Sequence, residues 1–167
     1  MKMTSAEAAK KLKELKEKIN VILMKEQKSE TFVAAVSEDP ESVRPVYDYE
    51  ATRKEQEELE KKIRLLKHAV SEFNLSKEVP GFQMTVDQLL IYIPQLTQRK
   101  NRLSEMADRL PKSRTGEGSY SNIIDYTYAN YDIEKAAADY AETSEELSRA
   151  QMALDLINTT EMMDVPE

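Results

Sequence analysis

The sequence predicts a mainly α-helical protein, built as an antiparallel four-helix bundle with coiled-coil-like seams and a small two-stranded β element at one end. The composition supports this class, because 33 % of the 167 residues are charged, 40 % are hydrophobic and only 3 are glycine, as is typical of long amphipathic helices. Four segments repeat apolar residues at steps of three and four. Segments of similar length with modest connections favour an up-down-up-down arrangement, which we expect to form one domain over residues 1–167.

The first helix is predicted over residues 5–30. Thr4 and Glu7 have the spacing of a capping box, so the helix begins at Thr4 or Ser5. An apolar seam follows at alternating steps of four and three, which is typical of a coiled coil. Its members are Ala8, Leu12, Leu15, Ile19 and Ile22.

The second helix is predicted over residues 48–73, after a connection that holds a candidate strand. β-Branched and aromatic residues, Phe32 among them, favour a strand at residues 31–36. Residues 37–42 favour a turn or loop, and Pro45 prevents a helix from continuing through it. The apolar seam of the second helix consists of Leu59, Ile63, Leu66, Val70 and Phe73. Glu and Lys residues lie between these positions, as expected of a water-facing surface.

The third helix is predicted over residues 85–110, where Thr85 and Gln88 again have capping-box spacing. Pro94 lies well inside this helix. Because proline lacks an amide donor and crowds the carbonyl one turn earlier, we expect a kink or a break there. The predicted buried side consists of Val86, Leu89, Ile93, Leu96, Leu103, Met106 and Leu110.

A second strand is predicted over residues 122–129, after an exposed loop. The large apolar residues Ile124, Tyr126 and Tyr128 alternate there with Asp125, Thr127 and Ala129, which is the period of two of a strand. In an up-down-up-down bundle the connections after the first and third helices lie at the same end. We therefore expect this strand to pair with residues 31–36. A two-stranded ribbon is marginally stable by itself, so the pair either packs on the bundle end or joins two subunits.

The fourth helix is predicted over residues 132–158, with Asn130 or Asp132 as its N-cap. Its inward side consists of Ile133, Ala137, Tyr140, Leu147, Leu154 and Ile157. The net charge of −7 is unevenly spread, with a balance of +4 over residues 1–29 and −9 over residues 122–167. Attraction between these regions favours packing of the first and last helices, unless both are solvated faces that do not meet.

Residue types limit the chemistry that is open to this chain. There is no cysteine, which excludes disulfides, cysteine-bound zinc and a thiol nucleophile. His68 is the only histidine and Leu65 stands three residues before it, so a ferritin-like di-metal site is excluded in its usual form. Gly116-Glu117-Gly118 lacks the features of a phosphate-binding loop. We therefore predict no catalytic residue, metal ion or cofactor, and a protein that is not an enzyme.

Aromatic and basic residues near the two predicted strands indicate an interaction surface instead. The basic stretch after the third helix either binds an acidic partner or complements the helix dipole. Nucleic acid is disfavoured, because the chain is acidic and no aromatic residue interleaves with the lysines of the first helix. The candidate interaction residues are Phe32, Tyr126, Tyr128, Tyr131, Lys112 and Arg114.

Several short motifs resemble a known family. They are Lys67-His68-Ala69 with Phe73-Asn74, Met84-Thr85-Val86-Asp87, Arg99-Lys100 with Leu103, Asn130-Tyr131-Asp132-Ile133, and Leu154-Asp155 with Asn158-Thr159-Thr160. Together they resemble the septicolysin-like family of mostly uncharacterised bacterial and phage-borne helical proteins. Many relatives carry a tryptophan where Thr159 stands here. The resemblance implies a helical fold, and the family name implies a haemolysin-like toxin.

The sequence thus favours a non-enzymatic helical protein that works by association, chiefly with itself. No apolar run approaches the roughly 18 residues that span a bilayer, and we expect a cytoplasmic homo-oligomer whose protein partner is unknown. The resemblance adds a phage-related assembly or accessory role. Two alternatives are a toxin-like, membrane-active protein and a small-molecule binder that uses the tyrosine-rich bundle end.

Overall fold

The computed structural model describes residues 1–115 and 125–166 and is mainly helical, with small antiparallel strand pairs. The helices are α1 (Ser5–Ser29), α2 (Pro40–Val43), α3 (Tyr49–Ser76), α4 (Val86–Ala107) and α5 (Ile133–Thr160). The strands are β1 (Lys2–Thr4), β2 (Glu78–Val79), β3 (Met84–Thr85), β4 (Lys112–Arg114), β5 (Tyr126–Tyr128) and β6 (Met162–Asp164). The four predicted long helices correspond to α1, α3, α4 and α5.

Contacts divide the chain into two compact units, which are described separately. Unit 1 contains Met1–Ser76 and Ile157–Glu167, and unit 2 contains Lys77–Leu156. The prediction of a single domain over residues 1–167, like that of one four-helix bundle, stays a prediction.

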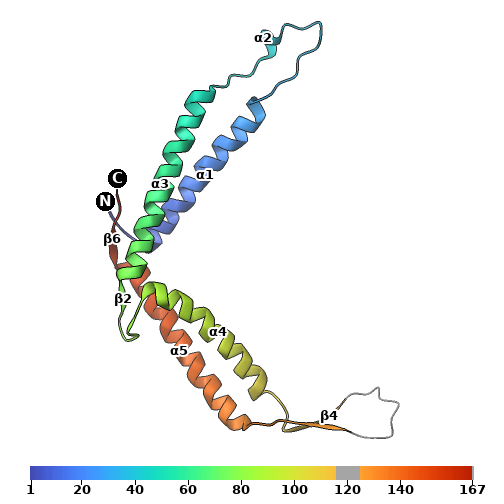
Figure 1. Cartoon of the computed structure of the whole chain (residues 1–167), viewed down its shortest axis with the longest axis vertical. Coiled ribbons are helices and arrows are strands. Elements are labelled where there is room, and N and C mark those ends of the chain that lie inside the picture. Colours follow the sequence, from blue (N-terminus) through green and yellow to red (C-terminus); the bar gives the residue numbers. More distant parts are fainter. Residues whose placement is uncertain (116–124, 167) are drawn as a thin grey trace. The chain divides into compact units, whose positions relative to one another are not determined.

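The core of unit 1 forms where α1 and α3 lie side by side (Figure 1). Ala8 and Leu15 of α1 are buried against Leu59, Leu66 and Ala69 of α3. The other seam residues pack around this cluster in a partly buried position, namely Leu12, Ile19, Ile22, Ile63, Val70 and Phe73. The apolar seams predicted for the first two helices therefore pack against each other.

A terminal sheet closes this core. β1 and β6 pair antiparallel, with Met3 opposite Met163, and both methionines and Val165 are buried in the α1–α3 cluster. The Val165 amide donates to the Met1 carbonyl at 2.8 Å, which extends the pairing by one more bond. Strands of three residues are too short to show a clear alternation of apolar and polar side chains, so the sequence pattern did not predict this sheet.

Unit 2 contains α4 and the larger part of α5, which lie side by side (Figure 1). Val86, Leu89 and Leu96 of α4 are fully buried. The helix runs through Pro94 without interruption. Of the two predicted alternatives, the break is therefore wrong, and the kink stays a prediction. It ends at Ala107, and Leu110, predicted to be buried, is therefore exposed.

The N-terminus of α5 settles which residue caps it. The Asp132 carboxylate accepts hydrogen bonds from the amides of Glu134 at 2.9 Å and Lys135 at 3.1 Å. Asp132, rather than Asn130, is therefore the N-cap. On the same helix Ala136 is buried and Ala137 is exposed, so the inward face is one residue away from the predicted one at this turn.

The predicted pairing of residues 31–36 with residues 122–129 is wrong. Residues 31–35 have no regular structure and residue 36 lies in a turn. β5 forms within the second predicted strand, but it pairs with β4, with Ser113 opposite Thr127. Closing a short local loop costs less conformational entropy than pairing two distant segments, which favours this hairpin. Residues 122–124 lie outside the described residues.

The capping box of α4 provides a stability test. The Gln88 amide donates to Thr85 Oγ1 at 3.4 Å, and the Thr85 amide donates to Gln88 Oε1 at 2.9 Å. Thr85→Ala is expected to lower the free energy of unfolding by about 1 kcal/mol, measured by urea denaturation followed by circular dichroism.

Thr97→Ala is the matched control, because Thr97 is exposed in the middle of the same helix and its hydroxyl donates to the Ile93 carbonyl at 2.9 Å, within the helix. Alanine has the higher helix propensity, so no loss is expected there. Equal losses at both positions would contradict a capping role for Thr85.

Candidate functional site

The β4–β5 hairpin gathers four of the six predicted interaction residues on one face. Side chains alternate between the two faces of a strand, and the register places Lys112 opposite Tyr128 and Arg114 opposite Tyr126. The Lys112 ammonium lies 4.0 Å from the ring centroid of Tyr126 and 5.4 Å from that of Tyr128. The two rings are 47 % and 61 % exposed, so an incoming group can reach them. We call these four residues the tyrosine face.

The opposite face of the hairpin and the ends of its ladder are held by local hydrogen bonds. Thr115 Oγ1 and Thr127 Oγ1 lie 3.0 Å apart. The Thr115 amide donates to the Asp125 carbonyl at 2.9 Å, and the Ala129 amide donates to the Pro111 carbonyl at 3.1 Å. The tyrosine face is thus supported by a regular strand pair.

Tyr131, which the sequence grouped with the other two tyrosines, is half-buried. Its hydroxyl donates a hydrogen bond of 2.7 Å to the carbonyl of Met106, in the last turn of α4. Carbonyls in the last turn of a helix lack an intrahelical partner. Tyr131 therefore stabilises the end of α4 and connects it to the beginning of α5.

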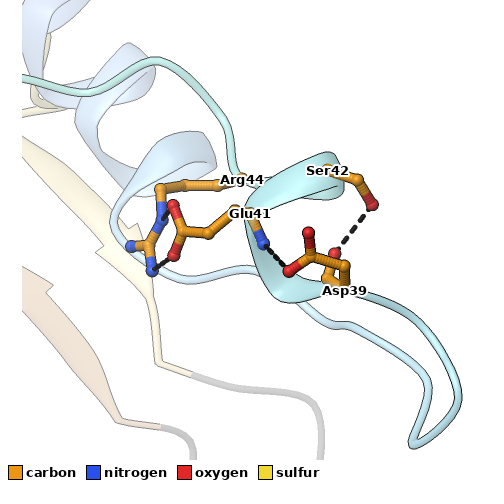
Figure 2. Close-up of polar contacts among 4 residues, drawn as sticks. All are labelled: Asp39, Glu41, Ser42 and Arg44. Carbon is orange, nitrogen blue, oxygen red and sulfur yellow. Dashed lines mark hydrogen bonds and ion pairs between the residues drawn. The ribbon is translucent and has the colours of Figure 1, made fainter.

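Phe32 belongs to unit 1, in the connection between α1 and α3. The guanidinium carbon of Arg44 lies 4.9 Å from the centroid of its ring. Arg44 in turn donates from Nη2 to Glu41 Oε1 at 2.6 Å and from Nε to Glu41 Oε2 at 2.9 Å (Figure 2). These bonds lower the pKa of Glu41 and raise that of Arg44.

The same connection contains the short helix α2. Asp39 caps it by accepting from the Glu41 amide at 3.1 Å, and the Ser42 hydroxyl donates to the Asp39 carbonyl at 2.7 Å (Figure 2). The pair of Glu41 and Arg44 was not predicted from the sequence. Its signal is the spacing of three residues, because residues three apart in a helical turn have neighbouring side chains.

Unit 1 also has an open groove of about 850 Å³ along one side of α1 and α3, which we call the helix groove. Val21 and Ile22 of α1, Leu59 of α3 and Val46 of the connection contribute its apolar lining. The remainder includes six acidic residues and three lysines. The groove is therefore apolar in part and negatively charged in balance. No sequence pattern predicted this groove.

One end of the helix groove is fixed by hydrogen bonds around Glu26. The Tyr47 hydroxyl donates to Glu26 Oε1 at 2.6 Å, and Gln56 Nε2 donates to Glu26 Oε2 at 2.8 Å. Gln56 is 4 % exposed, and Arg53 donates to its side-chain oxygen at 3.3 Å. This network joins α1, α3 and the connection that precedes α3.

The hydrogen bonds around Glu26 shift the pKa values of both Glu26 and Tyr47. Hydrogen bonds from Tyr47 and Gln56 lower the pKa of Glu26, and the bond to Glu26 raises the pKa of Tyr47 to about 12. Tyr47→Phe is expected to raise the pKa of Glu26, because the phenol hydrogen bond is the largest cause of the decrease. Titration of the Glu26 carboxyl by NMR measures this change.

The effect on stability follows from the direction of each shift. The lowered pKa of Glu26 contributes stability above its unfolded pKa, and this contribution is lost as pH falls through the folded pKa. The raised pKa of Tyr47 contributes stability below 10.0 that is lost as pH rises through about 12. The stability difference between wild type and Tyr47→Phe should therefore shrink towards both extremes. Tyr49→Phe, at an exposed neighbouring tyrosine, is the control; equal effects of both substitutions on Glu26 would contradict the assignment.

A smaller cavity of about 320 Å³ lies between α4 and α5 in unit 2. It is lined by Arg99, Leu103, Asp139, Glu142, Thr143 and Glu146. The Tyr92 hydroxyl donates to Glu146 Oε1 at 2.6 Å, and this bond raises the pKa of Tyr92. The contacts of this cavity join the two helices.

Residues 1–115 and 125–166 contain no group of three or more His, Asp or Glu side chains that is arranged to hold a metal ion. His68 is exposed on α3, with Nε2 3.5 Å from a carboxylate oxygen of Glu72. In the same ranges no helix combines the length and the apolar character that crossing a membrane requires.

Comparison with known proteins gives a fold and no family. No family model and no curated protein matches the chain. Its fold is similar to that of a functionally unknown conserved protein from Corynebacterium diphtheriae, solved as a crystal structure, with a TM-score of 0.59. The two chains are 18 % identical, and the match covers 98 % of this chain and 100 % of that chain. This likeness supports a mainly helical fold with small antiparallel strand pairs.

Proposed function

We propose that this protein is a non-enzymatic helical association protein that acts chiefly by binding another copy of itself. The helix groove is the observation that supports this proposal. Its lining includes Val21, which is 50 % exposed, and Val46, which is 102 % exposed. A groove between two adjacent helices is the place where a further helix packs in a bundle, so a second copy has a site on which to bind.

The proposal includes an antiparallel four-helix bundle with coiled-coil-like seams. When two helices pack together, each buries one apolar stripe against the other. A second pair of helices, supplied by the other copy, covers a further stripe on each. The resemblance to septicolysin-like proteins adds an assembly or accessory role, in a phage-related setting, to the same proposal. The genes that neighbour this one are the most informative observation for that role.

Self-association is tested by sedimentation velocity at micromolar concentration. We expect the wild type to be larger than a monomer and Val21→Asp to raise the dissociation constant at least tenfold, because a carboxylate in the apolar lining loses hydration when it is covered. Met24→Asp is the matched control, since Met24 is 65 % exposed on the same helix and does not line the groove. A monomeric wild type would contradict the proposal.

The tyrosine face supports a second candidate, a binding site for a small molecule or an acidic partner. Two exposed rings with Lys112 over both of them offer stacking together with positive charge. Fluorescence titration with a ligand library tests this candidate, by comparing the wild type with a variant that carries both Tyr126→Ala and Tyr128→Ala.

The toxin-like alternative rests on the resemblance to septicolysin-like proteins. Leakage of dye from liposomes on addition of the protein tests it.

A further inference from the structure

The α1–α3 hairpin divides along its length into two halves of opposite charge. Residues 1–16 and 61–76 lie in the same half, because Ala8 and Leu15 share one cluster with Leu66 and Ala69. They carry nine lysines and arginines and three glutamates, a balance of +6. Residues 17–60 carry six basic and twelve acidic residues, a balance of −6. We call these parts the basic half and the acidic half.

The C-terminal segment of unit 1 weakens this polarity without removing it. Residues 157–166 pack at the basic half through Met163 and Val165, and the sequence from residue 157 to residue 167 contains three acidic residues. The basic half therefore keeps a balance of +3 when they are included. Within the described residues, salt bridges at 3.6 and 3.9 Å engage Lys11 and Lys13 of α1, while none engages Lys10 or Lys67. The basic half thus has cations that are available to a partner.

The helix groove belongs mainly to the acidic half. All of its lining residues except Glu14 and Lys62 fall within residues 17–60, and acidic residues outnumber lysines by six to three in the lining. The groove face continues into the basic half through Lys10 and Lys11, which lie one helical turn before Glu14. A single face of the hairpin therefore presents an acidic groove followed by exposed lysines.

We propose that two copies pair antiparallel through their α1–α3 hairpins, so that the basic half of each covers the acidic groove of the other. This inference rests on the self-association proposed above and specifies its geometry. A two-fold axis repeats every contact, because the same patch of both subunits forms the interface. Antiparallel pairing therefore matches both halves at once, whereas parallel pairing opposes like charges along the whole hairpin.

The four helices of this dimer come from two chains. Val21 and Ile22, together with the rest of the apolar lining, are covered by the partner's hairpin and supply the affinity. The charges at the margin are exposed and screened by salt, and they chiefly determine orientation and choice of partner. The dimer is therefore expected to weaken as salt increases.

Charge reversal tests the orientation. Lys10→Glu with Lys11→Glu and, separately, Glu55→Lys with Glu58→Lys are each expected to raise the dissociation constant at least tenfold at low salt. All four changes in one chain should restore it to within threefold of wild type, because the opposed charges are again of opposite sign. Lys16→Glu with Arg64→Glu is the matched control. Each of these exposed residues stands two positions after a groove residue, Glu14 or Lys62, and therefore on the opposite side of its helix. This variant makes the same charge change and should alter the dissociation constant less than threefold.

Sedimentation equilibrium at two salt concentrations provides the dissociation constants, and circular dichroism confirms that each variant folds. A monomeric wild type overturns the self-association itself. A wild-type dimer that is indifferent to both reversals, or is not recovered by the four-fold variant, leaves self-association standing and overturns the antiparallel pairing. The chain has no cysteine, so cross-linking between introduced cysteines provides an independent check. A cross-linker should join Lys10→Cys chains to Glu55→Cys chains in a mixture, and either variant alone should give little product.

Discussion

Leu96→Ala is expected to lower the free energy of unfolding by about 3 kcal/mol, because Leu96 is completely buried in unit 2 and its truncation loses apolar transfer energy and leaves a cavity. Leu90→Ala is the matched control on the same helix, where the leucine is 44 % exposed. It should cost about 1 kcal/mol or less, since the water-exposed part of the side chain contributes little.

Urea denaturation followed by circular dichroism measures both changes. The slope of the transition should also be examined, because the two units need not unfold together. If the two units unfold separately, only the transition of unit 2 should move with Leu96→Ala. Equal effects of the two substitutions would contradict the placement of Leu96 in the core.

Ala8→Leu is expected to lower the free energy of unfolding by about 2 kcal/mol. Ala8 is completely buried between α1 and α3, and added methylenes force neighbouring side chains or backbone to move. Alanine at this position lets the helices approach closely. A larger side chain therefore separates them and also disturbs the terminal sheet, since Met3 and Met163 belong to the same cluster.

Ala9→Leu makes the same chemical change one residue further along α1, where the side chain is exposed. Alanine and leucine both have high helix propensity, so the free energy of unfolding is expected to change by no more than about 0.5 kcal/mol. Thermal and urea denaturation of the two variants give the comparison. A loss at Ala9 as large as at Ala8 would indicate that α1 does not pack in this orientation.

The long helices were predictable because local signals specify them. Both capping boxes form as the sequence indicates, with Thr4 and Thr85 as the N-caps. The predicted ends of the helices differ from the observed ones by three residues or fewer. Propensity, periodicity and capping all act within a few residues along the chain, and a single sequence contains that information.

The strand pairs were not predictable, since pairing is decided by tertiary context. The alternation around Tyr126 and Tyr128 predicted their strand correctly, but it contains no information about the partner. Thr31 to Val36 has strand-forming residues and still forms no strand, because β propensity reflects the packing that a neighbouring strand supplies. A strand without a suitable neighbour does not form.

The candidate site could be predicted only where it depends on contacts between residues close in sequence. Lys112, Arg114, Tyr126 and Tyr128 share one face because strand alternation and a short hairpin place them there. The helix groove was missed because its network joins Glu26 to Tyr47 and Gln56, which are 21 and 30 residues away in sequence. Contacts of this range depend on how α1 and α3 pack and leave no periodic signal.

The pairing of β1 with β6 also affects the order of events during synthesis. Met3 lies opposite Met163, so part of the core of unit 1 stays uncovered until β6 has left the ribosome. Unit 2 is continuous, from Lys77 to Leu156, and all of it emerges earlier. Since domains fold as they emerge, unit 2 can fold first, while the α1–α3 hairpin waits with exposed apolar surface. Of the two units, unit 1 is thus the one whose apolar surface stays open to a chaperone for longer.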